Sequence, residues 1–451
     1  MELSEVFYTK FSGAYNEFKL EANGQAPFIN KWREEGYQRL LLDGIPHKQL
    51  EDWKYSDLNK VLDPAFIQLL KKPTYTFRLE DIFRCDVPDL DTQSFTTLDG
   101  WYSDTENPLQ VLPDGVIIGS FREAALKYPE IVEKYLGQAT KTAEDGLSGM
   151  NAAFATDGMF IYIPENCVVE VPLQIIDIIS AETDLLVNRR NLFVGGKNSV
   201  ANVVVCDHSL TFQKSFTNSF TEVFTENGAV FNMTMIQNSS NNTSRNSSVF
   251  VSQKGRSTAT INTISLHGGF IRNNIHVALE GEFAESNLHG LYLGDRNQHV
   301  DNFTIVNHKV PDCLSNQKYK GILDDQARGV FTGRVVVSRD AQRTNAFQAN
   351  NNILLKDTAH VDSKPQLEIY ADDVRCSHGA TVGQLDTEAL FYLRSRGINE
   401  KEARMMLMFS FAAEVVDKIT VPALKLRITD MVEKRLRGEL SRCNHCAINC
   451  C

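Results

Sequence analysis

From about residue 150 to residue 370 the chain consists of short β-type segments, with no helix-length periodic stretch between them. The segments are β-branched or alternating, and turn clusters such as Asp157-Gly158 and Asn227-Gly228 separate them. Many strands of similar length without crossover helices exclude a doubly wound sheet and leave a sandwich, a propeller or a β-solenoid. We find no blade-like signature and no strict repeat, which an irregular β-helix accommodates. The pattern favours a mainly β protein with a parallel β-helix core.

The regions on either side of this core are helical in pattern. Residues 1–148 are predicted to be a mostly helical N-terminal region, with Tyr8–Leu20, Asn30–Leu41 and Phe121–Leu136 as helices. Between the second and third of these, Trp53 and Tyr55 are expected to anchor a turn against the next domain. We place the β-helix core at 149–383, a C-terminal helical region at 384–440 and a Cys-rich tail at 441–451. Helical regions are natural caps for the open sheet ends of a solenoid.

Three helices are predicted after the core. Thr387–Arg396 ends at a glycine, a second helix runs from Asn399 to about Ile419, and a third begins at Pro422. The segment Met405–Phe411 is apolar nearly all round, so it should be buried on more than one side. Methionine clusters adapt to partner surfaces. A cap made by the chain itself and a docking site for another subunit both remain open.

Charge and composition exclude several function classes. The net charge of −11 argues against non-specific nucleic-acid binding, which needs clustered Lys and Arg. No window approaches the ~18–20 apolar residues of a membrane span, and the first ten residues have no apolar signal core. We therefore expect a cytoplasmic protein with mostly reduced cysteines. Phosphate-loop and nucleophile-elbow motifs are absent, so no conventional enzyme signature is found.

One polar stretch interrupts the β pattern. Gln237–Ser248 reads QNSSNNTSRNSS, and we predict a low-complexity loop. Its N-x-S/T matches are attributed to chance, because there is no secretory signal.

The junction between core and C-terminal helices carries the main candidate site. In a strand, Cys376 and His378 point to the same face, and a soft ligand beside a borderline ligand suits a transition metal or sulfur chemistry. The alternative is a buried cysteine beside a hydrogen-bonded histidine. The other histidines of the β region form no metal-binding pattern and are expected to be mostly structural or solvated; they are His267, His276, His289, His299, His308 and His360.

The tail offers a second candidate site. A C-x-x-C with a histidine inside it and further thiols nearby can close a four-ligand Zn or Fe–S site, with Cys443, His445, Cys446 and Cys450 as candidate ligands. It lacks a second, well-separated C-x-x-C. The alternative is a frayed terminal tail with exposed thiols.

The junction motif also carries a family resemblance. The run from Asp373 to Gly383, DVRCSHGATVG, continued by Asp386 to Ile398, resembles the SufB/SufD family of the SUF iron–sulfur cluster assembly machinery. Glu51-Asp52-Trp53-Lys54-Tyr55 reinforces the match, which spans about residues 45–435. SufB-type members typically carry an acidic–His–acidic run where this chain has Cys376-Ser377-His378, so the resemblance favours the SufD type. The Cys-rich tail departs from the family pattern.

The resemblance implies a right-handed parallel β-helix flanked by helical regions, and a non-enzymatic scaffold role. It implies pairing with a SufB-like paralogue and binding of a SufC-like ABC ATPase through the C-terminal helices. His378 would lie at the paralogue interface as an iron ligand or proton handler, with Cys376 assisting or packing. The cargo would be a transient iron or Fe–S cluster shared with the partner, and no cofactor would be bound tightly by this chain alone. A homodimer is possible for the isolated chain. The candidate docking residues for the ATPase are Phe391, Tyr392, Met405, Met408, Phe409 and Phe411.

Two other functions are carried as alternatives. A secreted-type β-helix carbohydrate-active enzyme would need a secretion signal and a convergent acidic site, and the sequence shows neither. A metal or redox sensor would work through the terminal cysteines.

Overall fold

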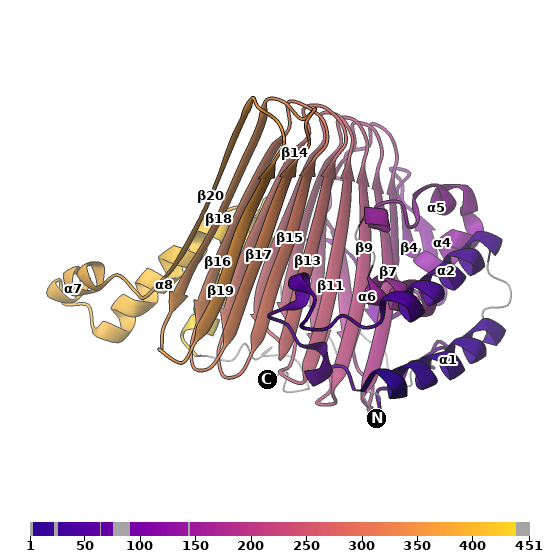
Figure 1. The fold of residues 1–451 in the computed structure, drawn as a ribbon, viewed down its shortest axis with the longest axis horizontal. Helices are drawn as coiled ribbons and strands as arrows, with labels where there is room; N and C mark the ends of the chain where they lie inside the picture. Colours follow the sequence, from indigo (N-terminus) through magenta and orange to yellow (C-terminus); the bar gives the residue numbers. More distant parts are fainter. Residues whose placement is uncertain (1–2, 22–25, 64, 75–90, 143–144, 439–451) are drawn as a thin grey trace.

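The computed structural model describes residues 3–21, 26–63, 65–74, 91–142 and 145–438. Within them the strands form two ten-stranded sheets, which we name after their last strands (Figure 1). The β20 sheet contains, in spatial order, β2 (Trp101–Tyr102), β1 (Gln93–Leu98), β6 (Leu173–Ile179), β8 (Val200–Ser209), β10 (Val230–Asn238), β12 (Thr258–His267), β14 (Glu285–Gly294), β16 (Leu314–Leu323), β18 (Thr344–Leu354) and β20 (Val374–Gly383). The β19 sheet contains β19 (His360–Ile369), β17 (Arg328–Val337), β15 (His299–His308), β13 (Phe270–Leu279), β11 (Thr243–Gln253), β9 (Ser215–Thr225), β7 (Leu185–Gly195), β5 (Met159–Ile163), β4 (Ile117–Ser120) and β3 (Leu109–Val111).

From β5 onward, successive strands alternate between the two sheets, and neighbours within a sheet run parallel. The register is regular: Thr344 of β18 pairs with Val374 of β20, and the ladder continues without a shift to Ile353 and Gly383. Strand alternation directs one row of side chains into the space between the sheets, where an apolar core includes Phe193, Val223 and Phe231. The predicted parallel β-helix core is therefore confirmed.

The two ends of the solenoid differ. At the N-terminal end of the solenoid, the sheets finish in antiparallel pairs: β1 with β2, β3 with β4, and β4 with β5. At the other end, β19 and β20 are the last strands of their sheets. Figure 1 shows β20 at the edge of the molecule, next to the projecting C-terminal helices.

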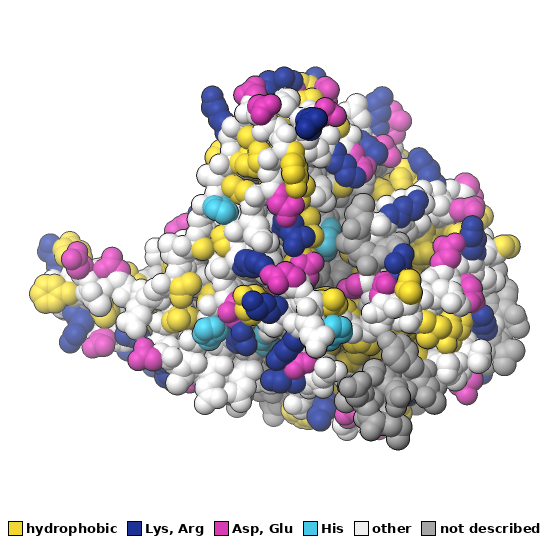
Figure 2. Space-filling model, viewed as in Figure 1, with side chains coloured by type: hydrophobic (Ala, Val, Ile, Leu, Met, Phe, Trp, Pro, Cys, Tyr) yellow, Lys and Arg dark blue, Asp and Glu magenta, His cyan; other side chains and the backbone are white. Residues whose placement is uncertain are grey.

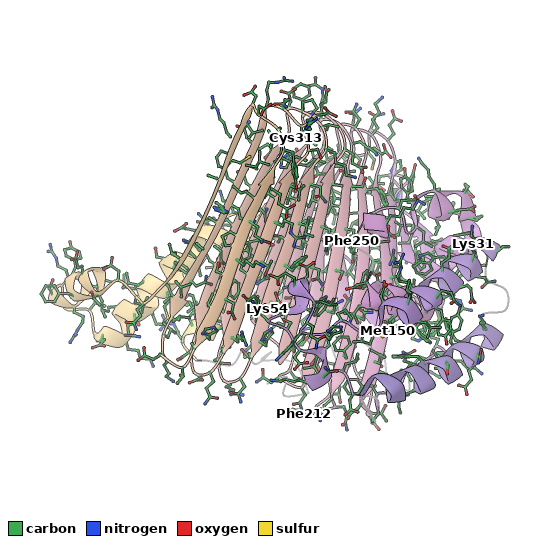
Figure 3. All side chains as sticks on the ribbon, in the orientation of Figure 1. Lys31, Lys54, Met150, Phe212, Phe250 and Cys313 are labelled. Carbon is green, nitrogen blue, oxygen red and sulfur yellow. The ribbon has the colours of Figure 1, made fainter. Side chains whose placement is uncertain are left out.

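Helices of the N-terminal region lie on the outer face of the β19 sheet, over the strands nearest its N-terminal end (Figure 1). They are α1 (Leu3–Glu21), α2 (Pro27–Asp43), α4 (Phe121–Lys127), α5 (Pro129–Tyr135) and α6 (Gly146–Phe154), with short 3-10 turns at Glu51–Trp53, Leu58–Lys60 and Thr140–Thr142. Leu147 and Met150 of α6 pack with Phe220 and Phe250 of the sheet, and Figure 3 labels Met150 in front of the strands.

The prediction of one helix over Phe121–Leu136 is wrong. α4 ends at Lys127, and α5 begins at Pro129. Tyr128 between them has φ −132° and ψ 53°, outside the helical region. A proline has no backbone N–H and cannot continue a helix, but it fits the first position of a new one. The break therefore follows from Pro129.

The C-terminal helices are α7 (Thr387–Ser395), α8 (Glu400–Val416) and α9 (Pro422–Leu436). α8 and α9 pack on the outer face of the β20 sheet, whereas α7 projects away from it. Asn399 caps α8 by accepting a hydrogen bond from the Glu402 N–H at 2.9 Å, and Pro422 begins α9, both as predicted. α8 stops at Val416 rather than near Ile419. The buried side of α8 and α9 forms one apolar cluster with strand residues such as Leu291 and Ile322.

The prediction of a loop over Gln237–Ser248 is also wrong for most of its length. β10 extends to Asn238, and β11 begins at Thr243. Asn246 is 1 % exposed; its amide donates to Asn218 at 2.9 Å and accepts from Asn274 at 2.9 Å. Asn246 is in register with Asn218 on β9, whereas Asn274 on β13 lies two positions beyond the register partner of Asn246. A polar strand is stable here because its buried amides hydrogen-bond to amides on the adjacent strands.

Residues 51–56 form a strap across the outer face of the β19 sheet. Trp53 is buried, and the guanidinium of Arg272 lies 3.9 Å from the centre of its ring. The strap contacts four different strands through the pairs Trp53–Arg272 on β13, Ser56–His299 on β15, Asp52–Arg334 on β17 and Glu51–Lys364 on β19. The predicted anchoring role of Trp53 is therefore confirmed.

Candidate functional site

β20 is an edge strand with one neighbour. It pairs with β18, and in the part of the chain that the structure describes no strand lies on its other side. Side chains of β18 alternate between buried and partly exposed, whereas most of those of β20 are exposed. An edge strand presents unpaired backbone N–H and C=O groups that can bind another chain. The junction motif thus lies on an open edge.

Cys376 and His378 share one face of this edge strand. Cys376 is in register with Ala346, and His378 is in register with Gln348. Ala346 and Gln348 are 0 % and 3 % exposed, while Phe347 between them is 43 % exposed. The alternation places Cys376 and His378 on the side that continues the interior of the solenoid.

The two side chains differ in environment. Cys376 is half-buried and packs with a small apolar cluster that includes Val337 and Ala346. Burial raises the pKa of its thiol, so Cys376 is a neutral thiol at neutral pH unless a metal or a base removes its proton. His378 is exposed. The edge therefore offers one accessible imidazole and one shielded thiol.

These two residues are an incomplete metal site. Within the described ranges, no group of three or more His, Cys, Asp or Glu side chains is arranged to hold a metal ion. Structural zinc and Fe–S sites use four protein ligands. Cys376 and His378 could supply two of them.

The remaining histidines of the β region behave as predicted. Burial lowers the pKa of His276 to about 3 and that of His289 to about 4. His289 Nδ1 lies 2.9 Å from Asn262 Oδ1, and His308 Nε2 lies 2.8 Å from Ser315 Oγ. His267 and His299 are also mostly buried, and His360 is exposed beside an aspartate. The expectation of structural or solvated histidines is confirmed.

The candidate docking residues divide into two groups. α7 has no buried residue, and its Phe391 and Tyr392 are 74 % and 57 % exposed. Figure 2 shows hydrophobic side chains at the tip of the projection that α7 forms. Met405 and Met408 are 5 % and 7 % exposed and face the chain's own core; Phe409 and Phe411 are half-buried against the same cluster. Of the six candidate docking residues, only Phe391 and Tyr392 are largely exposed to a partner.

The sequence analysis missed two exposed apolar residues in this region. Met406 of α8 is 45 % exposed and Leu426 of α9 is 73 % exposed. Helical spacing alone did not separate Met406 from the buried Met405 and Met408, since the segment Met405–Phe411 is apolar nearly all round.

Ion pairs fix the C-terminal helices to the solenoid. Glu414 of α8 accepts from Lys318 at 2.6 Å and from Lys320 at 2.7 Å, both on β16. Arg435 of α9 donates to Asp295 at 2.7 Å and to the backbone carbonyl of Leu266 at 3.0 Å. The helices are therefore held by charged contacts as well as by apolar packing.

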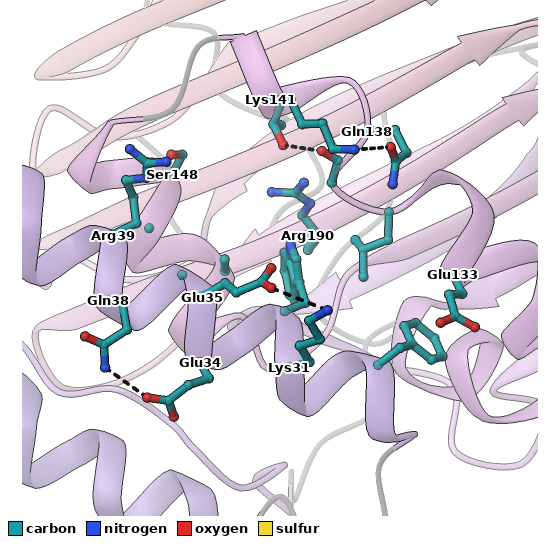
Figure 4. Close-up of a pocket in the computed structure, with 18 of the residues that line it drawn as sticks. Lys31, Glu34, Glu35, Gln38, Arg39, Glu133, Gln138, Lys141, Ser148 and Arg190 are labelled. Carbon is teal, nitrogen blue, oxygen red and sulfur yellow. Dashed lines mark hydrogen bonds and ion pairs between the residues drawn. The ribbon is translucent and has the colours of Figure 1, made fainter.

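A cavity of about 720 Å³ lies elsewhere, between α2 and the segments that follow α5 (Figure 4). Its walls include Trp32 and Arg190, and the charged groups at its rim pair with one another, as Lys31 does with Glu35 at 3.9 Å. Arg190 is paired with Glu222. Figure 1 shows α2 and β20 at opposite sides of the molecule, so this cavity is separate from the edge motif.

Two sequence predictions remain to be placed. Cys443, His445, Cys446 and Cys450 lie outside the described residues, so a metal site in the tail stays a prediction. No described helix is long and apolar enough to cross a membrane.

Comparison with known proteins agrees with the resemblance carried by the edge motif. A family model described as SUF system FeS cluster assembly, SufBD core domain, matches residues 178–411, and one described as SufBD protein N-terminal region matches residues 7–175. An iron–sulfur cluster assembly SufBD family protein of Synechocystis sp. is 28 % identical over 400 residues, which cover 87 % of each chain. The iron–sulfur cluster assembly protein SufD of Escherichia coli is 41 % identical over 181 residues, 40 % of this chain and 43 % of that protein. SufD of Bacillus subtilis is 26 % identical over 330 residues, 72 % and 74 % of the two chains.

These matches do not favour the carbohydrate-active or redox-sensor alternatives. The two family models together cover most of the chain, including the solenoid and its edge motif. The chain belongs to the SufB/SufD family of the SUF iron–sulfur cluster assembly system.

Proposed function

We propose that the chain is a non-catalytic, SufD-type scaffold subunit that helps to build and hand over nascent Fe–S clusters. The observation that carries the proposal is the placement of His378 and Cys376 on one face of an open edge strand. A SufB-like paralogue that pairs along this edge would supply the remaining ligands, and iron or a nascent cluster would be the transient cargo. In the absence of the paralogue, a second copy of the chain could occupy the same edge.

The chemistry of the two side chains supports this role. A neutral imidazole is a common ligand of iron. The shielded Cys376 would lose its proton on binding the metal, because metals bind thiolates. If Cys376 only packs, an apolar residue of similar size replaces it without loss.

The energy source would be a SufC-like ABC ATPase docked on α7. The exposed Phe391 and Tyr392 offer an apolar contact that the chain itself does not cover. The ion pairs between α8 and β16 would transmit movement of the bound ATPase to the solenoid.

The central experiment replaces His378 with alanine in cells that depend on this chain for cluster assembly. We expect His378→Ala to fold normally, because the side chain is exposed, and to abolish maturation of a [4Fe–4S] reporter enzyme. The matched control is Ser377→Ala, which changes an exposed neighbour on the opposite face of the same strand. Wild-type reporter activity in His378→Ala would refute the proposed role.

A further variant separates the two possible uses of Cys376, metal ligation and packing. Cys376→Ala retains the apolar packing and removes the thiol, so loss of reporter activity indicates ligation or sulfur chemistry. Retained activity assigns the thiol to packing.

Docking is tested by co-purification. Phe391→Asp combined with Tyr392→Ser should release the ATPase but retain the paralogue. Leu42→Asp is the control, since Leu42 is 79 % exposed on α2, away from α7. Undiminished recovery of the ATPase with the α7 variant would place its docking site elsewhere.

A further inference from the structure

Gln348 is a buried amide without a protein partner. It lies on β18, directly in register with His378 of β20, and is 3 % exposed. Neither its Nε2 nor its Oε1 has a hydrogen-bond partner among the described residues. Buried polar groups in proteins are nearly always hydrogen-bonded. We therefore expect the Gln348 amide, which lies next to the edge motif, to have a hydrogen-bond partner.

Gly333 on the opposite sheet makes room for this amide. A Cβ atom at Gly333 would lie 2.1 Å from Gln348 Nε2, closer than any real contact. The Gln348 amide therefore extends across the interior of the solenoid. The space that it occupies is open only because residue 333 is a glycine. This packing holds Gln348 directly beneath the edge strand, on the face that also carries His378.

Elsewhere in the solenoid, polar residues in this relation do hydrogen-bond. Asn262 and His289 are in register on β12 and β14, and Asn262 Oδ1 lies 2.9 Å from His289 Nδ1. On β18 and β20 themselves, Asn351 donates to its register partner Thr381 at 2.8 Å. An amide and an imidazole on adjacent parallel strands are thus within hydrogen-bonding reach.

We propose that Gln348 is a positioning residue for His378. Its Oε1 accepts the Nδ1–H of the imidazole, which fixes the tautomer and leaves the Nε2 lone pair directed over the open edge. The exposed ring reaches this arrangement by a change of rotamer, a fast motion for a surface side chain. In metal sites a ligating histidine donates its other N–H to an oxygen acceptor in the same way. The significance of this contact rests on the proposed function, but its existence does not.

The test measures the tautomer of His378 in the isolated full chain. Imidazole ¹⁵N chemical shifts are recorded at pH 8, and the His378 signals are assigned with His378→Ala. In the wild type we expect the Nδ1–H tautomer to predominate. In Gln348→Met, which retains length and volume without an acceptor, the ratio of Nδ1–H to Nε2–H should fall about three- to tenfold, as expected for loss of one hydrogen bond.

Gln317→Met is the matched control. Gln317 is equally buried and lies in the same row, one strand further from the edge, so its loss should leave the His378 tautomer unchanged. Gln348→Glu keeps an acceptor oxygen and should retain the Nδ1–H tautomer, which keeps the test informative if Gln348→Met does not fold. An unchanged tautomer in folded Gln348→Met, or an Nε2–H tautomer in Gln348→Glu, would overturn the inference. Failure of His378→Ala to affect cluster maturation would instead refute the proposed function alone.

Discussion

Replacing Arg272 tests whether the strap of residues 51–56 stabilises the solenoid. Arg272 is 2 % exposed, and its guanidinium is paired with Asp301, which is 1 % exposed. The same group donates to the backbone carbonyl of Asp52 at 2.7 Å and lies against the ring of Trp53. One side chain therefore joins β13, β15 and the strap.

The expected cost of Arg272→Met follows from the charge it leaves behind. Removing one partner of a buried ion pair leaves the other uncompensated, which costs about 3–5 kcal/mol. The contact with Trp53 is lost as well and adds roughly 1 kcal/mol. Replacing both partners, in Arg272→Met with Asp301→Leu, removes the uncompensated charge. The double variant should therefore recover most of the loss.

Urea unfolding followed by tryptophan fluorescence measures both effects, because Trp53 is one of only three tryptophans and lies directly on the guanidinium. Arg334→Met is the control. Arg334 also contacts the strap, through Asp52, but is 25 % exposed, so its loss should cost less than about 1 kcal/mol. A loss below about 1 kcal/mol for Arg272→Met, or a double variant as unstable as the single one, would refute the reasoning.

Three further predictions concern the solenoid itself. Burial lowers the pKa of His276 to about 3, so between pH 6.5 and 3 the unfolded chain binds more protons and stability falls as the pH falls. His276→Phe should weaken that loss, as seen in melting temperatures at pH 7.5 and 5; an unchanged pH dependence would contradict it. Gly158→Ala places a Cβ 1.9 Å from the Arg190 carbonyl oxygen and should lower the free energy of unfolding by at least about 1–3 kcal/mol. Gly379→Ala is the control, because a Cβ there meets nothing within 4 Å. Equal melting temperatures for the two variants would contradict this prediction. Asn246→Ala breaks the buried amide ladder and should cost about 1–3 kcal/mol by urea unfolding; a cost below about 0.5 kcal/mol would show that the ladder is dispensable.

The fold class was predictable because short strands without crossover helices leave few architectures. The strand content of Thr243–Ser248 was not, since polar residues there read as a loop. Asn246 is stable inside a strand because Asn218 and Asn274 on the adjacent strands hydrogen-bond to it, and a single sequence does not show which residues the strand register brings together. The break at Pro129, in contrast, was visible in the sequence and was missed.

The candidate site was predictable only within its own strand. Period-two alternation placed Cys376 and His378 on one face, and the register agrees. Gln348 lies thirty positions before His378, one coil earlier, and belongs to no recognisable motif. The sequence alone therefore did not connect the two residues. The sequence placed Met405 and Met408 in an apolar helical segment. Helical periodicity could not distinguish a helix face that packs on the chain's own solenoid from a face that binds a partner.

The strap has a consequence for how the molecule unfolds. A solenoid is nearly one-dimensional, because each coil contacts mainly its neighbours, so coils can open one after another from an exposed end. Glu51 and Lys364 are separated by 313 positions, and Asp52 and Arg334 by 282. These ties connect the last coils directly to the N-terminal region. Opening the β19 end therefore also requires release of the strap, which couples the coils into a more cooperative unit.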